Sequence, residues 1–158
     1  MKLLIVNGPN LNMLGIREKH LYGDRDYDAL CRYIRDAAGE LGCEVELFQS
    51  NHEGAIVDRI QQAYSDGTDG IVINPAAYTH TSVAILDALK AVQLPAVEVH
   101  LTDVDSREDF RRVSYAGMAC RARFTGLGFE GYRRAMEWIA REQGTGNRQR
   151  GTGVTGRH

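Results

Sequence analysis

Short apolar runs alternate with longer amphipathic stretches along most of the chain. Runs of strand length occur at Lys2–Val6, Glu44–Phe48, Gly70–Ile73, Ala96–Val99 and Arg121–Phe124. Stretches that carry apolar residues three and four positions apart, the spacing of a helix with one buried face, occur at Tyr27–Leu41, Gly54–Ser65, Ser82–Val92 and Gly131–Glu142. A shorter helical turn is expected after Ser106. The alternation predicts a series of βαβ units.

The apolar runs also indicate how the strands pair. Leu3 to Val6 and Ile71 to Ile73 are apolar without interruption, as in strands that are covered on both faces. Such strands are parallel, and helices form the crossovers between them. With 158 residues, 43% of them hydrophobic, the chain is long enough for one core. We predict a single-domain α/β fold with a flavodoxin-like, doubly wound, five-stranded parallel sheet.

Composition separates the body of the chain from its end. The domain is predicted to span residues 1–142, and residues 143–158 read as a Gly/Arg-rich tail with five glycines and almost no apolar side chain. A segment of this kind is expected to be disordered. All acidic residues precede Gln143 and three arginines follow it, so the body carries 16 basic and 21 acidic residues. This negative charge argues against a nucleic-acid partner.

Cysteines and hydrophobic stretches bear on localisation. The three cysteines are widely spaced and form no CxxC pair, which fits a reducing compartment better than a disulfide framework. The start has no signal-peptide core, and no run of about 18 apolar residues occurs. We therefore expect a cytoplasmic protein without a membrane partner.

Polar residues gather after the predicted strands. In a doubly wound sheet, ligands bind beyond the carboxyl ends of the strands, beside the point where the strand order reverses. The residues at these ends are Asn10, Arg17 and Tyr22 after the first strand, Ser50 and Asn51 after the second, Asn74–Ser82 after the third, and Glu98–Thr102 with Arg107 and Arg111 after the fourth. The groups are expected to converge on one edge of the sheet.

Glu98 and His100 form the first candidate pair. They are two positions apart in a predicted strand, so their side chains leave it on the same face and can touch. A carboxylate at one imidazole nitrogen fixes the tautomer and aims the other nitrogen at the crevice, which suits a general acid. The alternative is a structural ion pair.

Arg17 and Tyr22 form the second candidate pair, in a loop whose glycines and proline exclude a regular helix or strand. A phenol with a pKa near 10 is only about a thousandth ionised at pH 7, a deficit of roughly 4 kcal/mol. A guanidinium within about 4–6 Å lowers such a pKa by one to three units, so Arg17 could make Tyr22 a usable base. The alternative is a surface packing pair, and only convergence with His100 favours the catalytic interpretation.

Four further readings stay open. Backbone N–H groups around Thr79–Ser82, where a helix begins, can bind a carboxylate or oxyanion, or Thr81 or Ser82 can simply cap that helix. Gly126–Gly131 spells GxGxxG, but it follows the last strand and leaves no room for a ribose-binding acid, so a tight turn is favoured. His80 and His100 with an acid could bind a metal. A hydrolase using Ser82 or Ser50 with His80 would lack the GxSxG turn.

Several motifs in order resemble the type II 3-dehydroquinate dehydratases between about Met1 and Glu142. They are Asn7–Asn12, Arg17-Glu18, Tyr22-Gly23, Gln49–Asn51, Glu53-Gly54, Asn74–Ser82, Glu98–His100 and Arg107–Arg111. The resemblance implies a flavodoxin-like enzyme, usually a dodecamer of four trimers, that removes water from 3-dehydroquinate through an enolate without metal or organic cofactor. The step belongs to the shikimate pathway or to quinate catabolism. The remaining alternative is a flavodoxin-like module that binds a phosphate or nucleotide without chemistry.

The resemblance also implies a role for each residue. Tyr22 would be the base, Arg17 would favour its tyrosinate form, and both would lie in a loop that closes as a lid. Asn10 would hold a water against the enolate oxygen, and His100, oriented by Glu98, would protonate the departing hydroxyl. The substrate would be bound by the side chains of Asn74, His80 and Arg111, by the backbone N–H groups of Leu101 and Thr102, and by Asp87 from a neighbouring subunit.

Five positions depart from the family pattern. They are Lys19, Thr102, Asp103, Met118 and Ala122. Thr102 keeps a hydroxyl, so substrate binding is expected to survive. Asp103 adds a negative charge near an anion site and would weaken binding by about a kcal/mol if it pointed inward. These changes bear on efficiency more than on reaction class.

Overall fold

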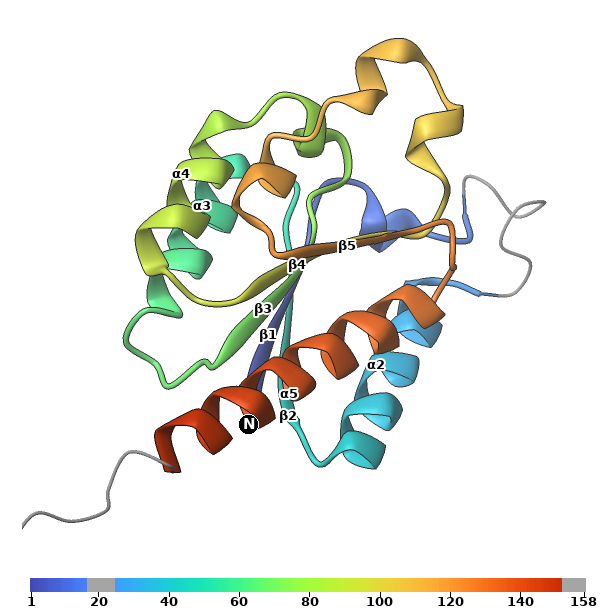
Figure 1. Ribbon diagram of the computed structural model, residues 1–158. Helices are drawn as coiled ribbons and strands as arrows, with labels where there is room; N and C mark the ends of the chain where they lie inside the picture. The colour runs from blue at the N-terminus through green and yellow to red at the C-terminus, as the bar shows by residue number, and fades with distance from the viewer. Residues whose placement is uncertain (17–24, 152–158) are drawn as a thin grey trace, which may run out of the picture.

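The computed structural model describes residues 1–16 and 25–151, and their side chains except at position 105 and positions 145–151. Five parallel strands form one sheet in the order β2-β1-β3-β4-β5 (Figure 1). The strands are β1 (Lys2–Asn7), β2 (Glu44–Gln49), β3 (Gly70–Asn74), β4 (Ala96–His100) and β5 (Ala122–Thr125). The predicted flavodoxin-like α/β sheet is confirmed.

Helices cover both faces of this sheet, as Figure 1 shows. They are α2 (Tyr27–Leu41), α3 (Glu53–Gln62), α4 (Val83–Val92) and α5 (Glu130–Gly151). On one face α2 and α5 pack on Leu3 and Ile5 of β1, and on the other α3 and α4 pack on Leu4 and Val6. Alternate residues of one strand therefore enter two separate cores, which explains why β1 is apolar without interruption.

Local chemistry sets the ends of the helices. Asp26 caps α2 by accepting a hydrogen bond from Ala29 N at 2.8 Å, and Gly42 ends this helix with a φ of 70°. The Ser82 hydroxyl caps α4 by accepting from Ile85 N at 3.0 Å. These caps satisfy N–H groups that a helix leaves unpaired, and they fix where the loops after β1 and β3 must end.

Two predicted helices end elsewhere. The predicted Gly54–Ser65 helix stops at Gln62, because the next three N–H groups bond three residues back in tight turns. The predicted Gly131–Glu142 helix continues to Gly151, and the Gln143 side chain donates to Asp69 O at 3.1 Å. The domain boundary predicted at Gln143 therefore falls inside α5. Disorder remains a prediction only for residues 152–158, which lie outside the described residues.

The strand order reverses between β1 and β3, and their two following loops meet there. Gly8 N donates to Asn74 O at 2.8 Å. A Cβ on Gly8 would lie 2.5 Å from the backbone oxygen of Pro75, closer than any side chain can approach. Glycine at position 8 thus lets the two loops touch at the point where a doubly wound sheet binds its ligands.

Gly8→Ala is expected to destabilise the fold by about 1–3 kcal/mol, because the added methyl meets backbone that cannot rotate away. The matched control is Gly39→Ala, since Gly39 lies in α2 with open space around its Cβ. There alanine is expected to stabilise by about 0.5–1 kcal/mol through helix propensity. Urea unfolding of both variants measures the two changes, and equal effects would contradict the close approach at Gly8.

Candidate active site

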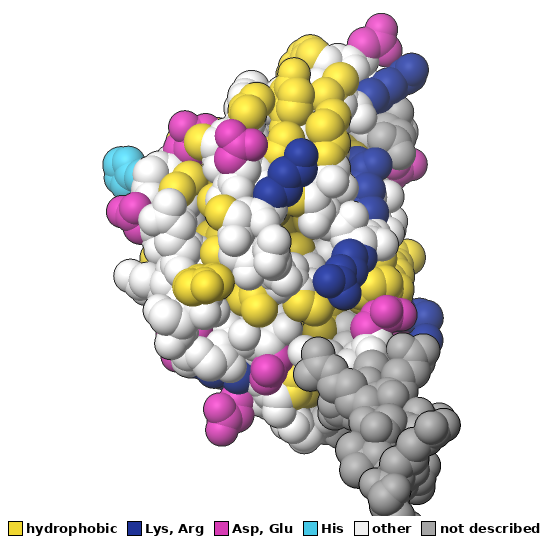
Figure 2. Space-filling model, turned by 60° about the vertical axis from the view of Figure 1, so that its left-hand side comes forward, with side chains coloured by type: hydrophobic (Ala, Val, Ile, Leu, Met, Phe, Trp, Pro, Cys, Tyr) yellow, Lys and Arg dark blue, Asp and Glu magenta, His cyan; other side chains and the backbone are white. Residues whose placement is uncertain are grey.

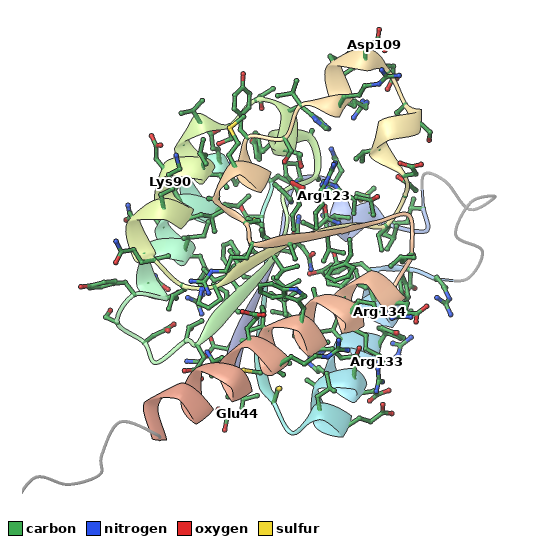
Figure 3. The ribbon with its side chains drawn as sticks, viewed as in Figure 1. Glu44, Lys90, Asp109, Arg123, Arg133 and Arg134 are labelled. Carbon is green, nitrogen blue, oxygen red and sulfur yellow. The ribbon has the colours of Figure 1, made fainter. Side chains whose placement is uncertain are left out.

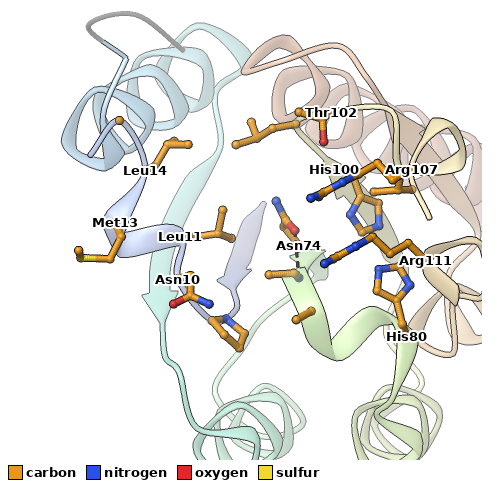
Figure 4. A pocket seen from close by; sticks show the side chains of 16 residues that line it. Asn10, Leu11, Met13, Leu14, Asn74, His80, His100, Thr102, Arg107 and Arg111 are labelled. Atoms are coloured by element: carbon orange, nitrogen blue, oxygen red, sulfur yellow. Dashed lines mark hydrogen bonds between the residues drawn. The ribbon is translucent and has the colours of Figure 1, made fainter. Parts of the chain in front are cut away.

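A cavity of about 510 Å³ lies beyond the carboxyl ends of β1, β3 and β4. Figure 4 shows the side chains that line it. The polar and charged lining residues are Asn10, Asn74, His80, His100, Thr102, Arg107 and Arg111. All seven were named among the residues at the ends of the predicted strands, and Leu101 shares the cavity with them.

The loop after β1 brings Asn10 to this cavity. Asn10 adopts a left-handed backbone with a φ of 69°, which asparagine tolerates better than most residues. Its N–H donates to Asn51 Oδ1 at 2.9 Å, and the Gln49 side chain donates to Gly8 O at 3.1 Å. Residues at and just after the end of β2 thus hold the backbone of Gly8 and Asn10 in place.

Asn74 is held from behind by a buried hydrogen-bond chain. Its Nδ2 donates to the Tyr132 hydroxyl at 3.1 Å, its Oδ1 accepts from Ala76 N at 3.2 Å, and Tyr132 donates to Asn7 Oδ1 at 2.6 Å. Asn7 in turn lies 3.5 Å from the Tyr27 hydroxyl. Burial raises the pKa of Tyr132, so its hydroxyl stays protonated and keeps donating. The network fixes the Asn74 amide at the cavity wall.

His100 and Glu98 lie together as predicted. His100 Nε2 is 3.4 Å from Glu98 Oε2, a distance at which the two form an ion pair when the imidazole is protonated. Glu98 is fully buried behind the cavity, and its second contact is a short hydrogen bond from the Ser114 hydroxyl. Burial raises the pKa of Glu98, but the contacts from His100, Ser114 and Arg123 outweigh it, so the pKa lies below its ordinary value.

The cavity carries positive charge. The His80 Nδ1–H donates to Val113 O at 2.7 Å, which leaves Nε2 as the other polar atom of the ring. Arg107 and Arg111 line the same cavity, with Arg111 Nε 2.7 Å from Glu108 Oε2. None of the described lining residues is acidic. The arrangement suits an anionic ligand with several hydroxyl groups.

Other predicted residues lie elsewhere. Asp87 is exposed on α4 and does not line the cavity of its own chain. Asp103 is exposed and is not a lining residue in the described part of the chain, so it adds no charge to the cavity wall there. Arg17, Tyr22 and Lys19 lie outside the described residues.

The structure also bears on the alternatives that the sequence left open. Among the described residues no three histidine, cysteine or acidic side chains are placed to hold a metal. Ser82 is 1% exposed and caps α4, so it is not available as a nucleophile. Gly126 and Gly128 have φ values of 75° and 60° in the turn between β5 and α5. The GxGxxG segment is thus the tight turn that was favoured.

Two contributions were missed by reasoning from the sequence. Arg107 was named after the fourth strand and in the Arg107–Arg111 motif but was given no role, although its spacing of four from Arg111 could have suggested that both face one ligand. Tyr132 gave no signal, because it is one of the apolar positions of α5 and its partner Asn7 lies 125 residues away. Long-range hydrogen bonds of this kind leave no local pattern.

The family model of class II dehydroquinases matches residues 1–140. The chain belongs to this family. It is 54% identical over 140 residues to the 3-dehydroquinate dehydratase of Lachnospira eligens, covering 88% of this chain and 95% of that relative. The type II dehydroquinase structure from Butyrivibrio crossotus is 50% identical, with a TM-score of 0.86 over 89% of this chain and 97% of the other. The one from Propionibacterium acnes is 39% identical, with a TM-score of 0.83 over 89% and 96%.

The lowered pKa of Glu98 predicts how stability depends on pH. Its carboxyl titrates below 4.5 in the folded protein and near that value when unfolded. The stability it contributes is therefore present above pH 4.5 and lost as the pH falls through the folded pKa. Urea unfolding between neutral and acidic pH is expected to show a steeper loss for the native protein than for Glu98→Gln. Parallel curves would contradict an ionised, stabilised Glu98.

Proposed function

We propose that this protein is a 3-dehydroquinate dehydratase, a hydro-lyase that converts 3-dehydroquinate to 3-dehydroshikimate. Membership of the class II dehydroquinase family over residues 1–140 carries the proposal. The cavity agrees with it, since its cations and amides suit a carboxylate that bears hydroxyl groups. The same step serves the shikimate pathway and quinate breakdown.

In the proposed reaction the first step forms an enolate. Tyr22, as a phenolate favoured by Arg17, takes a proton from the carbon beside the ketone. The electron pair of that C–H bond moves toward the ketone oxygen, and Asn10 holds a water that hydrogen-bonds to this oxygen. The position of Asn10 at the cavity wall supports its role.

The second step expels water. The enolate re-forms the ketone, the new C=C bond forms next to it, and the C–O bond to the leaving hydroxyl breaks. His100, oriented by Glu98, gives that hydroxyl its proton. The buried carboxylate 3.4 Å from His100 Nε2 supports this role, because a carboxylate at that nitrogen fixes the orientation and tautomer of the ring.

The remaining residues would hold the substrate. Asn74, His80 and Arg111 would bind its hydroxyl groups, and the N–H groups of Leu101 and Thr102 its carboxylate. All five residues line the cavity. The Asn74 amide, fixed by Tyr132, would then orient the ring without losing side-chain freedom on binding.

We further propose that the protein is a homo-oligomer, a dodecamer of four trimers, in which Asp87 completes the site of a neighbouring subunit. Asp87 faces outward from α4, away from its own cavity. Val83 on the same helix is 50% exposed and Met118, in a turn that packs against α4, is 63% exposed. Figure 2, which brings the left-hand side of Figure 1 forward, shows hydrophobic side chains gathered toward the top of this face. Exposed apolar side chains on α4, the helix that carries Asp87, and on the turn packed against it favour a subunit contact.

We also propose that the enzyme works in the cytoplasm. Cys31, Cys43 and Cys120 are all unpaired, as in proteins of a reducing compartment. Burial raises the pKa of Cys120 to about 12, so this thiol is protonated and unreactive. No helix within the described residues is both long and apolar enough to cross a membrane.

Tyr22→Phe is expected to abolish turnover, by about a thousandfold or more, and to leave substrate binding within about threefold, because only the base is lost. Absorbance of the conjugated enone product measures turnover, and calorimetry measures binding. Tyr64→Phe is the control, since Tyr64 is 75% exposed and remote from the cavity. If the native protein is folded but gives no enone signal, the proposed dehydratase activity is refuted. The alternative, a flavodoxin-like binding module without chemistry, would then be favoured.

Subunit complementation is expected to show Asp87 acting across an interface. Asp87→Asn and Tyr22→Phe should each be nearly inactive alone. Dissociated and reassembled together, they should regain activity, because some sites then combine Tyr22 of one chain with Asp87 of another. Absence of recovery in mixed oligomers, verified by tagging both chains, would show that both residues serve one chain or that Asp87 has no role.

A further inference from the structure

Arg123 is a charged residue in β5, the edge strand at the end of the sheet next to β4 (Figure 3). It lies in register with Glu98 of β4. Its Nε is 2.7 Å from Glu98 Oε1, while the other carboxylate oxygen faces Ser114 and His100. The guanidinium and the imidazole therefore approach different oxygens of one buried carboxylate.

The two cations of this cluster differ in kind. Within the described residues, the ion pairs of Glu98 are with His100 and Arg123. His100 must release and regain its proton in the proposed reaction, so it neutralises Glu98 for only part of the cycle. Arg123 stays charged at every working pH. It is therefore the partner that compensates Glu98 while His100 is neutral.

Apart from the hydrogen bond from the Ser114 hydroxyl, the surroundings of Glu98 leave little other compensation for its charge. The carboxylate has no exposed surface, and an isolated buried charge would protonate. Gly117 permits the approach of the covering turn, since a Cβ there would lie 3.2 Å from Glu98 Oε1 and 2.8 Å from Ser114 Oγ. Arg123 is 31% exposed at its side chain and links this closed site to solvent.

We propose that Arg123 is a positioning residue for the Glu98–His100 pair, keeping Glu98 ionised and fixed against His100 while that imidazole is neutral. The proposal rests on the proposed dehydratase function for its catalytic consequence. Without the guanidinium, Glu98 would share or take the proton that His100 has to hold for the departing hydroxyl. The proton would then be less available at the cavity.

Other titratable groups also face the Glu98–His100 pair, and they are the same in every variant at position 123. Cys120 lies beside Glu98, and that carboxylate, with burial, raises the pKa of its thiol to about 12. Arg121 lines the small cavity at the outer side of Glu98. On the inner side, His80, Arg107 and Arg111 share the main cavity with His100. The pH comparison must therefore be made between single substitutions at position 123.

The experiment compares Arg123→Met with Arg123→Lys, and uses Arg121→Met as the matched control. Steady-state kinetics across pH gives kcat and KM. Carbon-13 NMR of labelled glutamate carboxyls, with Glu98 assigned from Glu98→Gln, follows the titration of Glu98 without any need for turnover.

We expect Arg123→Met to raise the pKa of Glu98 by at least about half a unit. Its kcat should fall about tenfold with KM within about twofold, as for other partners that orient a reacting group.

The loss should also appear at the acidic side of the profile. Arg123 lowers the pKa of Glu98, so its removal moves the fall in kcat to higher pH. Arg123→Lys should restore most of kcat, and Arg121→Met should match the native enzyme. In a Glu98→Gln background, Arg123→Met should cause no further loss, because its only catalytic route is through Glu98.

Three outcomes would overturn the inference. They are an unchanged Glu98 titration in Arg123→Met, a fall in kcat that persists in the Glu98→Gln background, or an equal loss in Arg121→Met. If Arg123→Met does not fold, the Arg123→Lys titration and pH profile decide, since the shorter cation should shift both in the same direction by less. Native protein without turnover would instead refute the proposed function, and the NMR titration would still test Arg123.

Discussion

The carboxylate of Glu98 has no exposed surface, and the layout of the site follows from the need to keep it charged there. A bare carboxylate in a protein core protonates, because burial removes the water that stabilises its charge. Here Ser114, His100 and Arg123 each approach it, and their combined effect exceeds the effect of burial on its pKa. The three come from a loop, from the same strand and from the neighbouring strand. Strand register and turn position are therefore constraints on chemistry as well as on packing.

Around Asn74, by contrast, the buried polar side chains are held in place by hydrogen bonds between neutral groups. Asn7, Asn74 and Tyr132 satisfy one another in the core between β1, β3 and α5. Fully paired polar groups in a low-dielectric setting are rigid, because breaking any one of them leaves a buried donor or acceptor unpaired. The Asn74 amide is therefore supported by the interior of the protein and not by the loop that it begins. This supported amide and the imidazole of His100, from the neighbouring strand β4, both line the cavity.

How far the sequence determines these features depends on the range of the interactions. Strands and helices were predicted from local periodicity. Their alternation along the chain was enough to predict a parallel, doubly wound sheet. Asn74, His100 and Arg111 could be assigned to one cavity, because carboxyl ends of parallel strands share an edge. The partnerships of Glu98 with Arg123 and of Asn7 with Tyr132 span 25 and 125 residues, and no periodicity reports them. Composition predicted a tail from Gln143 onward, but α5 continues through this Gly-rich segment to Gly151. The Gln143 side chain there donates a hydrogen bond to Asp69 O, directly before β3.

Charge alternates outward from the centre of the site, and in the proposed reaction this order connects substrate binding to proton transfer. Arg107 and Arg111 make the cavity positive, which favours an anionic substrate. Glu98 lies behind His100 as its carboxylate partner, and Arg123 lies beyond Glu98 and offsets the burial of its charge. Removing any one of these charged groups leaves the next group without its compensating charge, so a substitution at one position also affects the neighbouring position. An enzyme that binds an anion with cations and also donates a proton to it needs such a buried anion between the two tasks.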